Sequence, residues 1–174
     1  MKRTLCLLLL LAGCGKEPAP AAGAPWTTLA AGLRGVNDAR AWRVAGGIAA
    51  PTEEEARTGR IPVRFTSDYL SAKETSGPVP LTPSLRKDLI KLLGDSSVVG
   101  NGLHPCMPTP GIKVRFERPP ADPVLVFFCF ECHELFAYEG STLREHKGFD
   151  DGVSKLAAVM KKIFPSDPVI QSLK

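Results

Sequence analysis

The spacing of apolar residues predicts two amphipathic helices in the second half of the chain. One spans residues 82–94, where Thr82 is a favourable N-cap, the following proline suits the first helical position and a glycine ends the element. The other spans residues 152–164, with Asp150 or Asp151 as its expected cap. In both segments apolar residues recur every three or four positions, so we expect each helix to bury one apolar face.

Between these helices the pattern changes to that of β-strands. Apolar and charged residues alternate over 112–117, which predicts a strand with one buried face, and a proline-rich turn over 118–123 follows it. Residues 124–130 are apolar at every position and therefore on both faces, which predicts a central strand that the helices cover on one side. Residues 135–138 form a third strand or continue the second past a bulge. Together these segments predict an antiparallel meander.

The first half of the chain gives weaker signals. We expect a short helix within 26–40, a strand over 41–44, a polar loop over 45–58 and an edge strand over 61–65. Strands and helices do not alternate in a βαβ pattern, so the predicted fold class is α+β, with a small antiparallel sheet packed against two amphipathic helices. Residues 26–174 are expected to form one domain.

The first fourteen residues are typical of an export signal. Two basic residues precede an apolar run from Leu5 to Leu11 that is too short to span a bilayer, and small residues lie directly before Cys14. The quartet Leu11-Ala12-Gly13-Cys14 resembles the lipobox of bacterial lipoproteins. This resemblance implies that residues 1–13 are a signal peptide and that Cys14 is the site of lipid attachment. The segment 14–25 is rich in Ala, Pro and Gly, and this composition predicts a flexible tether.

The same resemblance implies a location. The membrane would be the partner of the mature chain through its lipid anchor, because more than one acyl chain gives stable anchoring. Gly15 follows Cys14 in place of the aspartate that retains enteric lipoproteins at the inner membrane. The expected location is therefore the outer membrane of the cell envelope, with the domain facing the periplasm or the cell surface.

The charge pattern argues against nucleic acid as a partner. Removing Lys2 and Arg3 with the signal peptide halves the formal net charge of +4, and the remaining basic residues are mixed with acidic ones rather than gathered in a stripe. Ser141, Ser154 and Ser166 lie outside the motifs of nucleophilic serines. The sequence thus gives no catalytic residue, and it does not identify an envelope protein partner.

One motif carries chemistry, the segment Cys129-Phe130-Glu131-Cys132-His133. It matches C-x-x-C-H, which is typical of covalent haem c attachment, and His104 or Met107 is a candidate distal ligand. In an extended strand, however, side chains three residues apart point to opposite faces, so one haem edge could not take both thiols. Haem is therefore an alternative rather than the expected cofactor.

The three cysteines that follow Cys14 favour a disulfide. Folding strand 112–117 against strand 124–129 pairs residue 112 roughly with residue 129, which brings Cys106 toward Cys129 and Cys132. In an oxidising compartment we expect a disulfide from Cys106 to either of them, stabilising the fold by about 3 kcal/mol. A thioredoxin-like site is less favoured, because its C-x-x-C lies at a helix N-terminus. A zinc site is a further alternative to the disulfide, and its ligands would be Cys106, Cys129, Cys132 and either His104 or His133.

The remaining polar residues suggest ordinary structural roles. His146 is expected in an exposed loop, and Glu131 and Glu134 at a solvated strand edge. The segment 106–138 is similar to small exported bacterial proteins with a Cys-Phe-x-Cys strand, a resemblance that brings no activity with it. The sequence therefore predicts a non-enzymatic interaction or structural module with a disulfide-stabilised fold and no cofactor. The alternative is a c-type haem electron-transfer or thiol-redox protein that uses residues 129–133.

Overall fold

The computed structural model describes residues 28–45, 68–106, 109 and 111–174. The predicted signal peptide, the tether, nearly all of the loop 45–58, the edge strand 61–65 and Met107 lie outside these residues. The described elements are α1 (Leu29–Gly32), β1 (Asp38–Ala45), η2 (Asp68–Ser71), β2 (Lys73–Glu74), β3 (Val79–Pro80), α3 (Pro83–Leu93), β4 (Ile112–Arg118), β5 (Ala121–Cys129), β6 (Glu134–Glu139), β7 (Thr142–Gly148), η3 (Asp150–Gly152), α4 (Val153–Ile163) and α5 (Pro168–Gln171).

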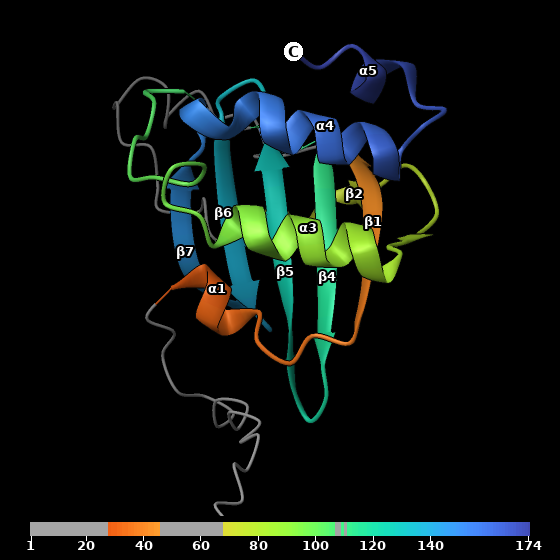
Figure 1. Ribbon diagram of the computed structural model, residues 1–174, viewed down its shortest axis with the longest axis vertical. Helices are drawn as coiled ribbons and strands as arrows, with labels where there is room; N and C mark the ends of the chain where they lie inside the picture. The colour runs from red at the N-terminus through yellow and green to blue at the C-terminus, as the bar shows by residue number, and fades with distance from the viewer. Residues whose placement is uncertain (1–27, 46–67, 107–108, 110) are drawn as a thin grey trace, which may run out of the picture.

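The strands among the described residues form one seven-stranded antiparallel sheet (Figure 1). Its order is β2-β1-β4-β5-β6-β7, and β3 also pairs with β1. This sheet with its helices confirms the α+β class, but the prediction of a small meander is wrong. Among the described strands, only β4 to β7 follow one another as a meander. Strand β1 comes from a distant part of the chain and extends the sheet by pairing antiparallel with β4, with its alternate residues buried.

The register of the meander is close to that expected from the sequence. Ile112 lies opposite Phe128, one residue from the predicted partner. The segment 134–139 is a separate strand that pairs antiparallel with β5, which decides between the two alternatives for it. The sequence did not indicate β7, since an edge strand carries polar residues in place of a clear apolar alternation.

Helices α3 and α4 lie across one face of the sheet (Figure 1). Helix α3 begins as predicted, with the Thr82 hydroxyl accepting a hydrogen bond from the backbone N–H of Leu85. The prediction that Asp150 or Asp151 caps α4 is wrong, because the N-cap is Gly152 and makes no side-chain cap bond. The helix expected within 26–40 is only the short α1, since the chain has already joined the sheet at Asp38.

The sheet buries apolar side chains on both faces. Alternate residues of β4, β5 and β6 face α3 and α4 and form the main core with Leu89, Leu93, Leu156 and Met160 of the helices. On the other face, η2 supplies Tyr69, whose ring centroid lies 4.5 Å from that of Phe136 and 6.3 Å from that of Phe127. Strand β5 is therefore central, as predicted, and η2 covers the face that the helices leave open.

A buried ion pair joins β4 to β6 at the end of the sheet that carries α1. The Arg118 guanidinium contacts the Glu139 carboxylate and donates to the carbonyl oxygen of Gly32 at 2.9 Å, while Arg144 donates to the other oxygen of Glu139 at 2.6 Å. Burial acts to raise the pKa of Glu139, but the hydrogen bonds from Arg118 and Arg144 outweigh it and hold this pKa below its ordinary value. This pair fixes α1 against the β4–β5 hairpin.

Within the described ranges, no helix combines the length and the apolar character that crossing a bilayer requires.

Candidate functional site

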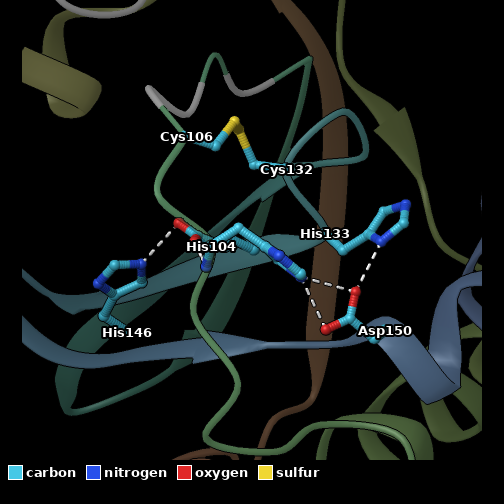
Figure 2. The surroundings of a disulfide bond; sticks show 7 residues. His104, Cys106, Cys132, His133, His146 and Asp150 are labelled. Atoms are coloured by element: carbon cyan, nitrogen blue, oxygen red, sulfur yellow. Dashed lines mark hydrogen bonds and ion pairs between the residues drawn. A yellow bond between two sulfur atoms is a disulfide. The ribbon is translucent and has the colours of Figure 1, made fainter.

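All three histidines of the chain meet at one corner of the domain (Figure 2). His104 lies in the loop between α3 and β4, His133 in the turn between β5 and β6, and His146 on β7. The fourth residue of this corner is Asp150 in η3, directly after β7. Segments that are far apart in sequence thus bring their polar side chains to one end of the sheet.

Asp150 joins two of the histidines. Both of its carboxylate oxygens lie 2.8 Å from Nε2 of His104, and one of them lies 2.8 Å from Nδ1 of His133. These hydrogen bonds, first that of His133 and then that of His104, lower the pKa of the Asp150 carboxyl. The three side chains are each about two-fifths exposed, so the cluster opens to solvent.

Glu134 ties the third histidine to the same corner. Its side chain is almost completely buried, and its carboxylate accepts from the backbone N–H of His104 at 2.8 Å and lies 2.9 Å from Nε2 of His146. The His146 ring also stacks on Phe136, with centroids 4.2 Å apart. The predictions of a solvated Glu134 and of His146 in an exposed loop are therefore wrong, because β7 pairs with β6 and places both residues within the sheet.

The cysteines lie beside this cluster. Cys106 and Cys132 form a disulfide with Cα atoms 5.9 Å apart, and Cys129 is a buried free thiol. This is one of the two pairings that the sequence left open. The disulfide occupies one thiol of the C-x-x-C-H motif and β5 buries the other, so neither of the alternatives considered from the sequence, haem attachment and a cysteine-based zinc site, has its thiols available in this form of the protein.

The backbone around the cluster is tightly fitted. A β-bridge joins Gly100 to Gly148, and a Cβ at position 148 would lie only 1.6 Å from the carbonyl oxygen of Gly102, so the loop that carries His104 packs directly on the end of β7. His133 has a φ of 53°, a left-handed conformation in which histidine is more common than most residues. Its carbonyl oxygen accepts from the backbone N–H of Phe149 at 2.8 Å, which links the β5–β6 turn to η3.

The arrangement has the chemistry of a metal-binding site. Two imidazole nitrogens and one carboxylate oxygen lie within 4.8 Å of one another on His104, His133 and Asp150. The sequence singled out both histidines as ligand candidates but not Asp150, which was assigned to a helix cap. No local signal marks Asp150 as a ligand, because the strand that brings residue 148 opposite residue 134, β7, is one that the sequence did not indicate. Met107, the other candidate ligand, lies outside the described residues.

No protein-family model matches the chain, and neither the curated proteins nor the solved structures contain a significant match to it.

Proposed function

We propose that the protein is a lipid-anchored domain of the bacterial cell envelope that acts as a non-enzymatic interaction or structural module, attached through Cys14 and located at the outer membrane. The observation that carries this proposal is the quartet Leu11-Ala12-Gly13-Cys14, and the disulfide between Cys106 and Cys132 supports export. Disulfides persist in exported proteins and are rare in the cytosol, so the bond agrees with the export signal and lipobox pattern at the start of the chain.

The disulfide and helix α1 lie at opposite ends of the sheet. It links the loop before β4 to the turn between β5 and β6, at the corner that carries the histidines. Helix α1, the first described element after the tether, lies at the opposite end of the sheet, where Gly32 contacts Arg118 (Figure 1). The described part of the chain therefore begins at the end of the sheet that lies opposite the histidine corner.

The anchor is tested with two matched cysteine variants. The wild-type chain, Cys14→Ser and Cys6→Ser are expressed in a bacterium that processes lipoproteins, and their membrane and soluble fractions are compared. We expect the wild type and Cys6→Ser in the membrane fraction, with a mass that shows loss of residues 1–13 and addition of lipid, and Cys14→Ser without lipid. An unprocessed wild-type chain in the cytosol would contradict the proposal.

The disulfide and the alternative function are tested on the same purified protein. Alkylation after denaturation without a reductant should modify only Cys129, because the other two thiols are joined to each other. Modification of all three cysteines would contradict a disulfide-stabilised module. A covalent Soret band in protein made with a cytochrome c maturation system would instead support the haem alternative.

A further inference from the structure

We propose that His104, His133 and Asp150 form a binding site for a divalent first-row transition metal, with zinc as the ion that tests it. Imidazole and carboxylate groups are both zinc ligands, and open zinc sites have three protein side chains with the fourth position left to water. This site goes beyond an interaction or structural role. It also differs from the cysteine-based zinc set considered from the sequence, since it uses no thiol.

The spacing of the ligand atoms supports the proposal. A zinc ion about 2.0–2.1 Å from each nitrogen or oxygen needs its tetrahedral ligands roughly 3.3 Å apart. The oxygens of Asp150 lie 2.8 Å from the nearest nitrogen of each histidine, and all three ligand atoms fall within 4.8 Å of one another. An ion can therefore enter through small rotations of three exposed side chains. Each ring would bind through the nitrogen that now faces Asp150, with its proton moved to the other ring nitrogen.

The backbone that carries the ligands is already fixed. The N–H of His104 is held by the buried Glu134, and the carbonyl oxygen of His133 is held by Phe149. The disulfide adds a covalent link between the same two segments, because Cys132 directly precedes His133 and Cys106 lies two residues after His104. Fixing the segments before the ion arrives reduces the entropy that binding must overcome.

The site is open on its outer side. The side chains of His104, His133 and Asp150 are 45%, 38% and 44% exposed, so water reaches the position that the three protein ligands leave free. A site of this kind binds one ion per chain and keeps an exchangeable fourth ligand, unlike a closed structural zinc site with four protein ligands.

The test is a titration of the purified protein with its disulfide intact, as the membrane-processed chain in detergent and without an added histidine tag. Zn²⁺ is titrated by calorimetry, and Co²⁺ by its visible absorption, which reports tetrahedral coordination. We expect one ion per chain. His104→Ala, His133→Asn and Asp150→Asn should each weaken zinc binding by at least about tenfold, because loss of a group that merely supports a metal ligand already weakens binding by about that factor. Asparagine also tolerates the left-handed backbone at position 133.

The matched control is His146→Gln, which changes the third histidine of the corner but can still donate to Glu134. It should retain the wild-type affinity. Circular dichroism and thermal unfolding of every variant separate loss of the ligand from loss of the fold. Absence of zinc binding to the wild type, full binding by the three ligand variants, or an equal loss in His146→Gln would each overturn the proposal.

Discussion

Removing the disulfide between Cys106 and Cys132 should destabilise the domain by about 3.5 kcal/mol. The bond closes a loop of 26 residues, and the chain-entropy relation then gives roughly 12 cal/mol/K, or about 3.5 kcal/mol at 25 °C. The contribution arises mainly in the unfolded chain, which is freer when the crosslink is absent. The double variant Cys106→Ala/Cys132→Ala, in which neither thiol remains, measures it directly.

The assay is urea unfolding of the wild type, both single variants and the double variant, followed by circular dichroism. Each single variant already lacks the crosslink, so all three variants should lose nearly the same free energy of unfolding. Two independent side-chain contributions would instead add in the double variant. A double variant that loses the sum of the single losses, or a wild type no more stable than the variants, would refute the reasoning.

The same double variant should also bind zinc more weakly than the wild type, because the segments that carry His104 and His133 lose their covalent link. Alanine is used in place of a reductant because free thiols would themselves bind zinc. If the double variant folds and binds zinc as tightly as the wild type, the disulfide does not position the histidines.

Three further changes test the buried ion pair of Glu139, the partly buried carboxyl of Glu145 and the backbone packing at Gly148. Glu139→Ala should lower the free energy of unfolding by about 3 kcal/mol at neutral pH, because it removes the carboxylate that pairs with the buried Arg118 guanidinium. Since the folded-state pKa of Glu139 is lowered, this loss should shrink as the pH falls through that pKa. Urea unfolding at a series of pH values measures it. Burial raises the pKa of Glu145, so this group favours folding at acid pH and opposes it once the pH exceeds the folded-state pKa. Glu145→Gln should therefore stabilise the protein at neutral pH, and thermal unfolding across pH measures the change. Gly148→Ala should cost about 1–3 kcal/mol and weaken zinc binding, because the new Cβ would displace the backbone at Gly102, as urea unfolding and calorimetry will show.

Each of these changes has a control within the same chain. Glu117→Ala removes an exposed ion pair and should change stability little, so an equal loss there would contradict the argument for Glu139. Glu131→Gln neutralises an exposed carboxyl and should not stabilise the protein as Glu145→Gln does. Gly100→Ala meets no atom within 4 Å and should be tolerated; equal effects at positions 100 and 148 would contradict the close-approach argument.

Much of the fold follows from local pattern. The apolar stripe of α3, its threonine cap and the uninterrupted apolar run of β5 are properties of short segments, and the structure agrees with each of them. The pairing of residue 112 near residue 129 was also accessible, because a short turn fixes the register of a hairpin. By contrast, the pairing of β1 with β4 joins segments separated by more than sixty residues, and no local pattern specifies it.

The candidate site was only partly accessible for the same reason. The sequence identified His104, His133 and the three cysteines by residue type, since imidazoles and thiols are reactive wherever they lie. It assigned Asp150 to a helix cap, because an aspartate before an apolar helix usually has that role. The structure directs this carboxylate to two histidines instead.

The sequence by itself determined the class of fold, the helices α3 and α4, the strands β4 to β6, the lipobox resemblance and the residue types available for chemistry, because each depends on neighbouring residues. Only the tertiary structure decided which cysteines are joined, that Glu134 is buried, and that His104, His133 and Asp150 share one corner. These features depend on the pairing of β6 with β7 and on the loop packed over Gly148. Their physical origin is the burial of apolar faces across the whole sheet, which places distant polar residues together without any local signal of their meeting.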